Sequence, residues 1–464
     1  MAWISNWSVK PGWRSCVLMT ASFLLLAVLE KQPVLLLPLL GFLALGYAGL
    51  VLMRSGGARF LGWAVFVIVL AYAWLKKYTF LPPASLLGFS YFTLGISYIF
   101  FRILHLLIET AERPELYPVG PGEFLLYMLN FTTLVSGPIQ RYEEFAREQF
   151  AEHPPALGSQ VIGAQIERIV LGLFKVNVLA MLLHMAQLDA LAQLSEPLSA
   201  DAKIWAAMKL CAIYPFFLYA NFSGYIDIVI ALARLMHLEL PENFDRPFSA
   251  SSFLDFWNRW HITLSVWLRT YVYNPLLLFL MRRFSSPAIQ SSLGVVCFFV
   301  TFFLVGLWHG RTMEFIIFGA LQGGGVAANK LWQNSLTRAL GRKGYKDVSG
   351  RRWYVALGRG LTFSWFAFSL FWFWATSSEL TVIAGAIHVA QWFGVWVAMI
   401  GASAVLLSVW ESLHGKLLAS GTRGAWLPSN PYVRAMNAAT LGLVAFVMTV
   451  LLSQPAPDIV YKAF

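Results

Sequence analysis

Long apolar runs without charge alternate with short polar segments along the chain. Three of these runs contain no Asp, Glu, Lys or Arg, namely Tyr78–Phe101, Ala288–Gly310 and Gly360–Ser378. A fourth, Leu380–Trp410, is uncharged over 31 residues. Because a helix needs about 20 apolar residues to cross a bilayer, the pattern predicts an all-α polytopic membrane protein. The fourth run predicts either one long tilted span or two shorter segments joined by a turn.

The runs predict a bundle of about 11–12 transmembrane or re-entrant helices. We expect them near residues 15–30, 33–53, 60–76, 86–108, 123–136, 160–187, 204–235, 288–309, 314–333, 353–378, 381–410 and 436–453. Segment 123–136 is short for a full crossing, so we interpret it as a candidate re-entrant helix.

Composition supports a membrane protein and excludes a soluble multidomain one. Hydrophobic residues make up 58% of the 464 positions and charged residues only 12%, whereas soluble domains carry about 25% charged residues. We therefore expect a single membrane-embedded domain over residues 1–464. It would comprise N-terminal helices (1–90), a core (90–325), and a basic cytoplasmic loop with C-terminal helices (326–464).

The formal net charge of +11 comes from basic residues that lie mainly between the expected spans. The most basic segment runs from Arg338 to Arg359, and the positive-inside rule places it in the cytoplasm. The same rule explains the charge without a nucleic-acid partner, so membrane lipids are the expected surroundings. Glu30-Lys31-Gln32, rather than small residues, follows the first apolar run, which predicts an uncleaved first span.

The sequence gives no sign of a metal or a bound cofactor. The three cysteines, Cys16, Cys211 and Cys297, are far apart and lack metal-like or disulfide-like spacing. A phosphate-binding loop and a dinucleotide fingerprint are also missing.

The stretch from residue 227 to 275 lacks a clean apolar run and is rich in Pro, Asn, Trp and charge. Candidate helix caps follow its turn residues, at Ser249, Ser251 and Ser252. The helix expected after them carries a bulky stripe on one face, made by Trp257, Trp260, Leu264 and Trp267. Two interpretations are open: an amphipathic helix at the membrane interface, or a segment inside the bundle that presents His261 to a cavity.

A second histidine occurs at the end of an uncharged run. His309 stands between Trp308 and Gly310, where an imidazole must be hydrogen-bonded or functional. Imidazole is the side chain best suited to take a proton near neutral pH.

Three sequence blocks carry a family resemblance. In chain order they are "ENFDRPF", "FWNRWHITLSVWLRTYVYNPL" and "GLWHG". Together they resemble the membrane-bound O-acyltransferase family, in particular its bacterial alginate O-acetyltransferase and teichoic-acid D-alanyl-transfer branches. "GISYIFFRILH", "SGPIQRYEEF", "LGLFKVNVLA" and "NFSGYIDIVIALARL" are similar to upstream family segments. The resemblance covers roughly residues 90–325.

The resemblance implies a ring of helices around a central tunnel, with an acyl thioester arriving from the cytoplasm and the acceptor from the other side. It implies that His309 is catalytic and that His261 is its companion. Positions that match the family or adjoin its motifs would bind substrate or support the site, namely Asp227, Asn243, Trp257, Asn258, Arg259, Trp260, Ser265, Trp267, Arg269 and Trp308.

Three departures from the family pattern leave the acyl group and the acceptor open. Thr270 stands where an Asp is usual, "LLLFLMRRF" replaces a Gly-Gly-Asn-Arg turn, and Gln322 stands where a His-Gly pair often closes the later helix. "FWNRWH" favours the D-alanyl branch. Asp227 and Lys175 interrupt apolar spans, and for both a structural ion pair or hydrogen bond is the simpler interpretation.

Acyl transfer from a thioester to a hydroxyl fits these residues. The reaction needs a base for the alcohol and donors for the oxyanion, and we expect His309 to be the base. His261, Arg259 and Asn258 are candidate donors or orienting groups. The donor would be acetyl-CoA or an acyl-carrier-protein thioester, and no Ser or Cys motif suggests a covalent intermediate.

The expected enzyme is a multi-pass protein of the bacterial cytoplasmic (inner) membrane. It would transfer an acetyl group to an extracytoplasmic polysaccharide or envelope polymer, with D-alanyl as the alternative. Two other hypotheses stay open: a transporter or flippase that uses midplane charges such as Asp227, and a scaffold for a periplasmic transferase.

Overall fold

The computed structural model describes residues 2–82, 86–89, 91–116, 118–284, 286–419 and 431–452. The predicted spans 86–108 and 436–453 each include one residue outside this part of the chain. Helices dominate the described residues, and their only β pairing is an isolated antiparallel bridge between Phe244 and Trp260. The all-α prediction is therefore confirmed. The described residues form two compact units, one within residues 1–169 and 226–242 and the other within residues 170–225 and 243–460.

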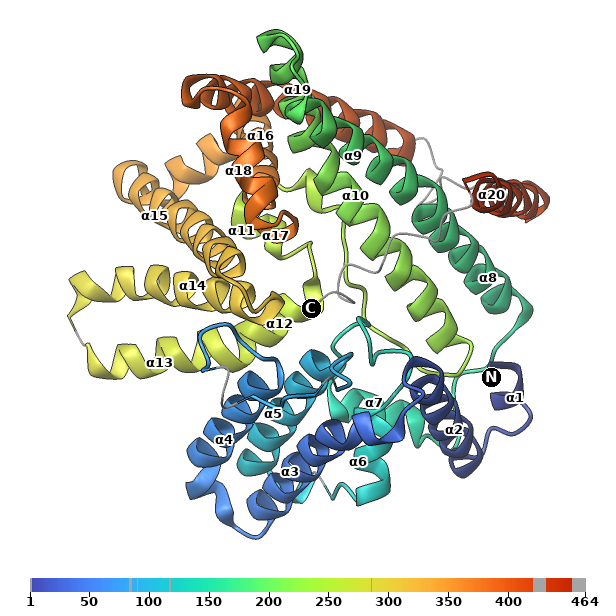
Figure 1. Ribbon diagram of the computed structural model, residues 1–464. Coiled ribbons are helices and arrows are strands. Elements are labelled where there is room, and N and C mark those ends of the chain that lie inside the picture. The colour runs from blue at the N-terminus through green and yellow to red at the C-terminus, as the bar shows by residue number, and fades with distance from the viewer. Residues whose placement is uncertain are drawn as a thin grey trace. The chain divides into compact units, whose positions relative to one another are not determined.

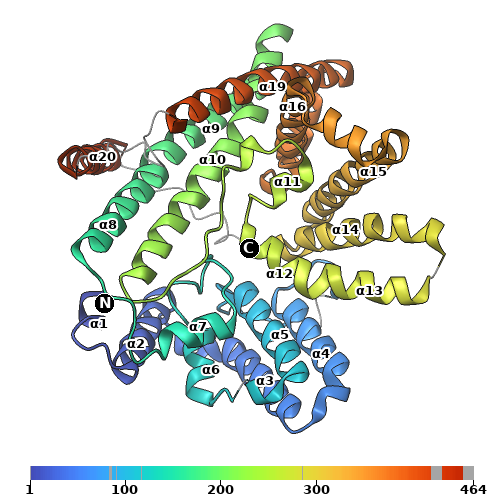
Figure 2. The ribbon, with the colours of Figure 1, turned by 180° about the vertical axis from the view of Figure 1, so that it is seen from behind.

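The first unit contains seven complete helices within its described residues. They are α1 (Ala2–Ser5), α2 (Pro11–Leu29), α3 (Leu37–Arg54), α4 (Leu61–Leu75), α5 (Ile96–Glu112), α6 (Pro121–Met128) and α7 (Tyr142–Gln149). The helices α8 (Ser159–Phe174) and α10 (Ala200–Arg234) belong partly to each unit. In Figures 1 and 2, α3, α4 and α5 lie side by side.

Helix α5 forms the core of the first unit. Gly46 on α3 allows a close approach, because a Cβ there would lie 2.7 Å from the Ile103 side chain. Buried Arg102 donates 2.8 Å hydrogen bonds to the carbonyl oxygens of Tyr127 and Met128. These two residues end α6, so Arg102 satisfies carbonyl groups that have no partner within that helix. His105 Nε2 accepts from the Tyr142 N–H over 3.2 Å. These contacts are structural.

The second unit contains the later helices. After a π-helical turn at Lys175–Ala180 they are α9 (Met181–Ser195), α11 (Phe253–Trp257), α12 (Ile262–Leu268), α13 (Asn274–Arg283), α14 (Pro287–His309), α15 (Met313–Ser349), α16 (Arg352–Ser369), α17 (Phe371–Trp374), α18 (Ser377–Ala386), α19 (Val389–Ala419) and α20 (Pro431–Leu452). Another π-helical turn, Arg269–Tyr273, joins α12 to α13.

Glycines let the helices of the second unit pack at close range. A Cβ on Gly319 of α15 would lie 2.5 Å from the Phe303 carbonyl oxygen of α14, and the two helices run side by side in Figure 1. A Cβ on Gly360 of α16 would lie 2.4 Å from the Ile400 carbonyl oxygen of α19. Small residues at such contacts are the usual basis of helix association in membranes.

Eight described helices are long and apolar enough to cross a membrane. They are Pro11–Leu29, Pro33–Arg54, Gly57–Leu75, Ser159–Ser195, Ala200–Arg234, Ser292–His309, Val389–Gly415 and Tyr432–Leu451. The chain is therefore a multi-pass membrane protein, with fewer such helices in this part than the 11–12 expected. The ring, the tunnel and the single domain stay predictions.

Four predicted spans do not meet the length and apolarity of a crossing. Helix α5 begins only at Ile96 and has 17 residues, and α6 has eight. The helices α15 and α16 are long enough but too polar. The run 381–410 is divided between α18 and α19, as one of its two interpretations required.

The basic segment from Arg338 to Arg359 is not a loop. Helix α15 continues to Ser349, through a kink at Gly341 whose φ is +71°, and α16 begins at Arg352. The charge pattern shows that the segment is polar, but it does not distinguish a helix from a loop. The three residues of this segment before the kink, Arg338, Ala339 and Leu340, are all good helix formers.

Candidate functional site

A short β-like pairing holds His261 between two helices. The Asp245 N–H donates to the Arg259 carbonyl oxygen over 2.9 Å, and the Ile262 N–H donates to the Asn243 carbonyl oxygen over 3.0 Å. This pairing ends α11 and starts α12, with His261 at φ +46°. The predicted continuous helix with a four-residue stripe is therefore wrong, because the chain turns at residues 258–261.

Burial decides between the two interpretations of this segment. Trp257, Trp260, Leu264 and Trp267 are all buried, and His261 has no exposed surface. A helix lying on the membrane interface would expose one face. Burial therefore favours a segment that lies inside the bundle.

Of the three candidate caps, Ser252 caps α11, because its hydroxyl accepts from the Asp255 N–H.

The side chain of Asn243 determines the protonation of His261. Its Oδ1 accepts from the Thr263 N–H over 3.1 Å and from the Thr263 hydroxyl over 2.9 Å. A backbone N–H can only donate, so this atom is the amide oxygen. His261 Nδ1, 3.2 Å from the same oxygen, must therefore carry the proton. Nε2 keeps the lone pair, and burial lowers the pKa of His261 to about 3, which favours the neutral ring.

His309 ends α14 inside an aromatic enclosure. Its side chain is buried. The ring centroids of Trp308, Phe373 and Phe318 lie 4.7, 5.1 and 5.9 Å from that of His309. An imidazole in such an enclosure is shielded from competing water.

The two glycines of "GLWHG" permit this enclosure. A Cβ on Gly306 would lie 2.4 Å from the Gly319 Cα, and one on Gly310 would lie 1.9 Å from the Phe315 ring. Both distances are too short for any side chain. The motif therefore combines a histidine with the close approach of α14 and α15 that surrounds it.

Trp308 connects the two histidine blocks. Its ring centroid lies 6.1 Å from that of His261 and 4.7 Å from that of His309. Spacing along the chain alone, 48 residues, gave little reason to pair them. The structure places both imidazoles against one tryptophan in the second unit.

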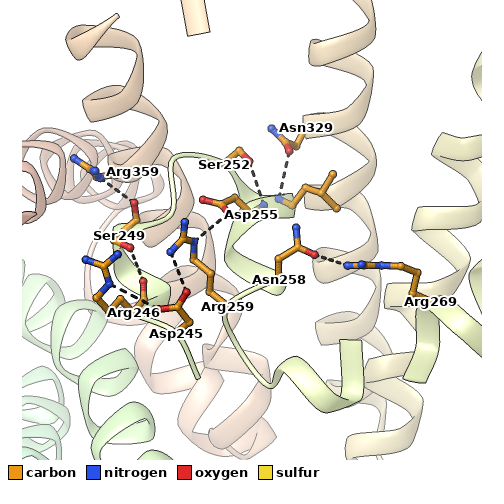
Figure 3. A network of polar contacts seen from close by, with 11 residues as sticks. Asp245, Arg246, Ser249, Ser252, Asp255, Asn258, Arg259, Arg269, Asn329 and Arg359 are labelled. Atoms are coloured by element: carbon orange, nitrogen blue, oxygen red, sulfur yellow. Dashed lines mark hydrogen bonds and ion pairs between the residues drawn. The ribbon is translucent and has the colours of Figure 1, made fainter. Parts of the chain in front are cut away.

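Four further candidates line one small cavity. Trp257, Asn258, Ser265 and Arg269 surround a space of about 20 Å³ beside α14, which is enough for one water. Within the described residues, Trp257 Nε1 and Ser265 Oγ are buried without a hydrogen-bond partner. The Asn258 Oδ1 accepts from the Arg269 guanidinium, as Figure 3 shows.

Arg259 is committed to carboxylates. Its Nε lies 3.0 Å from Asp255 and its Nη1 lies 3.6 Å from Asp245, and Figure 3 shows the guanidinium between them. Trp260 packs on Phe244, with ring centroids 5.0 Å apart.

Trp267 and Asp227 each contact a residue that is not one of the two histidines. Trp267 packs on Tyr271, with ring centroids 5.0 Å apart. Asp227 lies in the first unit, where the Arg168 guanidinium is 3.0 Å from its carboxylate. Asp227 is therefore a member of an ion pair, as its structural interpretation expected, and its supporting role at the site stays a prediction.

Sequence reasoning missed three residues around the histidines. Thr263 shares the oxygen of Asn243, and Phe318 and Phe373 enclose His309. Only Thr263 had a local signal, two positions after His261. Among the described residues, no cluster of three or more His, Cys, Asp or Glu side chains has the geometry of a metal site.

The fold and the site define a multi-pass membrane protein with two buried histidines around a shared tryptophan. The chain belongs to the membrane-bound O-acyltransferase family, whose model matches residues 16–366. The match includes every candidate site residue.

Curated relatives come from two groups. The chain is 31% identical over 291 residues to the teichoic acid D-alanyltransferase of Streptococcus thermophilus, covering 60% of this chain and 66% of the relative. It is 26% identical over 292 residues to that of Bacillus subtilis, covering 62% and 69%. It is 32% identical over 237 residues to the probable alginate O-acetylase AlgI of Pseudomonas syringae, covering 51% of this chain but only 42% of the relative.

Proposed function

We propose that this protein transfers an acetyl group from a cytoplasmic thioester to a hydroxyl of an extracytoplasmic polysaccharide or envelope polymer. It would act in the bacterial cytoplasmic (inner) membrane. The observation that carries the proposal is the placement of His261 and His309 against Trp308, in a chain of the O-acyltransferase family.

The reaction balances without a bound cofactor. The acceptor oxygen attacks the thioester carbonyl, the new C–O bond forms, and the C–S bond breaks. His309 takes the hydroxyl proton and returns it to the leaving thiolate, which departs as a thiol. General-base help of this kind contributes about 10²–10⁴ in rate. The donor is acetyl-CoA or an acetylated carrier protein, and a periplasmic transferase is a candidate partner for delivery to the polymer.

The surroundings of His309 support an uncharged acyl group. The rings around it belong to Trp308, Phe318 and Phe373, and an apolar enclosure suits a methyl group. A D-alanyl group carries an ammonium, which is costly to bury without a carboxylate. D-alanyl transfer is nevertheless the second candidate, because the teichoic acid D-alanyltransferases match a larger share of this chain than the alginate relatives do.

The test uses the full-length protein reconstituted in lipid vesicles. Radiolabelled acetyl-CoA, an acetylated carrier protein and a D-alanylated carrier protein are supplied in turn with a hydroxyl-bearing polysaccharide. We expect label to appear in the polymer as an ester from one of the acetyl donors. If label appears in the polymer only with the D-alanyl donor, D-alanyl transfer replaces acetyl transfer as the function.

The variants His309→Ala and His261→Ala test the site. His388→Ala is the matched control, because His388 is exposed between α18 and α19. We expect all three proteins to insert and purify alike. Transfer should fall by about 10²-fold or more in His309→Ala, the loss of a general base, and stay unchanged in the control. Full activity in His309→Ala would contradict the mechanism.

A further inference from the structure

A large cavity of the second unit has no role in this proposal. It has a volume of about 770 Å³ and lies among α15, α16 and residues 251–253. Aromatic side chains dominate its wall, including Trp332, Tyr345, Trp353, Tyr354 and Trp365. No charged side chain is among its lining residues.

Glycines explain why this space is open. Gly324 lines the cavity, and a Cβ there would meet nothing within 4 Å. The kink at Gly341 divides α15, and residues on both sides of it line the wall. The Trp332 Nε1 donates to the Tyr354 hydroxyl over 3.0 Å, which ties α15 to α16 across the wall. The Asn329 Oδ1 accepts from the Leu254 N–H over 3.3 Å.

Three lining residues of the cavity, Tyr345, Ser349 and Trp353, have cationic neighbours in the sequence. We call this part of the lining the basic end. Five exposed basic residues surround these positions in the sequence, namely Arg342, Lys343, Lys346, Arg351 and Arg352. None of the five forms an ion pair with another described residue. Only one acidic residue, Asp347, lies among them.

Exposed tryptophans also line the cavity. Trp332 and Trp353 line the cavity and are 56% and 58% exposed. Tryptophans collect at membrane–water boundaries, and cytoplasmic basic clusters attract anionic lipids. A phosphate complements the charge of the basic end, and a hydrocarbon chain complements the uncharged aromatic wall.

We propose that the cavity binds an anionic phospholipid, with one acyl chain along the aromatic wall and the phosphate among Arg342, Lys346 and Arg352. The site is separate from the histidines and does not depend on acyl transfer. A lipid held there bridges α15, whose first turns enclose His309, to α16.

Two kinds of variant test the site. Gly324→Leu and Ala328→Phe fill the cavity, because each places a large side chain where a small residue of α15 lines the wall. Gly401→Leu is the matched control, because a Cβ on Gly401 of α19 also meets nothing within 4 Å. Lys346→Gln/Arg352→Gln removes two cations from the basic end. Arg282→Gln/Arg283→Gln, on exposed residues that end α13, is its control.

Each protein is purified in mild detergent and mixed with phosphatidylglycerol or phosphatidylcholine, and retained lipid is counted by native mass spectrometry. A photoactivatable phosphatidylglycerol is then crosslinked and mapped by peptide sequencing. We expect selective retention of phosphatidylglycerol and crosslinks on α15 and α16. Both cavity-filling variants and the doubly neutralised variant should bind it at least about fivefold more weakly, while the controls retain it.

Three results would overturn the proposal. The first is unchanged phosphatidylglycerol binding in both Gly324→Leu and Ala328→Phe. The second is equal retention of phosphatidylcholine, which carries no net charge. The third is displacement of the crosslink by acetyl-CoA, which would make the cavity part of the donor path. Proposals about acyl transfer would survive any of these outcomes.

Discussion

The Nδ1–H of His261 donates to the side-chain oxygen of Asn243 over 3.2 Å. The same oxygen accepts both donors of Thr263, so one buried amide holds the ring, its tautomer and the first turn of α12. Asn243 is therefore a positioning residue for His261, and it directs the lone pair of Nε2 away from itself.

Replacement of Asn243 by Ala should reduce both stability and transfer. The change leaves three buried donors without their common acceptor, at a cost of about 1–3 kcal/mol for such a group. We expect a lower unfolding temperature and a fall in transfer by about tenfold or more. Thermal unfolding in detergent and the vesicle assay measure the two effects. Asn221→Ala, at another buried asparagine, serves as the control. Equal transfer losses in the two variants would mean that Asn243 acts on stability alone.

Replacement of Asn243 by Asp should change the pH dependence instead. An Asp retains an acceptor oxygen but adds a negative charge beside Nδ1, which stabilises the imidazolium and raises the pKa of His261 from about 3. With a raised pKa, His261 takes up its proton at a higher pH as the solution is acidified. Transfer by Asn243→Asp should therefore decline at a higher pH than transfer by the natural protein. A pH–rate profile with an unmoved acidic limb would argue against a functional His261.

The sequence motifs identified the histidine blocks but not how they meet. "GLWHG" showed a histidine at the end of an uncharged run, but the close packing that its two glycines allow became visible only in the structure. The periodicity of Trp257, Trp260 and Trp267 suggested one helix. The turn at His261 depends on Asn243, a partner 18 residues earlier, and no local pattern reports such a bond. Apolar periodicity also could not separate a crossing from a buried half-length helix such as α6.

Gly310→Ala should lower stability in a way that a second substitution can repair. The added Cβ meets the Phe315 ring at 1.9 Å, while φ at Gly310 is −149°, a conformation open to any residue. The cost is therefore steric. We expect about 1–3 kcal/mol of destabilisation from overpacking and loss of transfer. Phe315→Ala should restore much of both, measured by thermal unfolding and the vesicle assay.

Gly306→Ala is the contrasting case. Its Cβ would meet backbone atoms, the Gly319 Cα and the Phe315 carbonyl oxygen, both at 2.4 Å. Removal of the Phe315 side chain cannot relieve that contact, so Phe315→Ala should not rescue Gly306→Ala. Rescue of both variants, or of neither, would show that α14 and α15 are not packed as described.

The ion pair between Arg168 and Asp227 should support the first unit rather than the chemistry. Arg168 also binds Glu242 through two 2.7 Å contacts, but Glu242 is 60% exposed whereas Asp227 is 15% exposed. Arg168→Ala removes the guanidinium beside a carboxylate in an apolar span. We expect destabilisation of about 1–3 kcal/mol, and a much smaller effect from Glu242→Gln, since exposed pairs contribute little.

Asp227→Asn separates the two roles that this carboxylate could have. In the Arg168→Ala background it removes the buried charge, so it should restore much of the lost unfolding temperature. If Asp227 is structural, the double variant should also regain transfer, because no carboxylate is needed at the histidines. A double variant that is stable but inactive would instead place Asp227 in the reaction, where the family resemblance first suggested a supporting role.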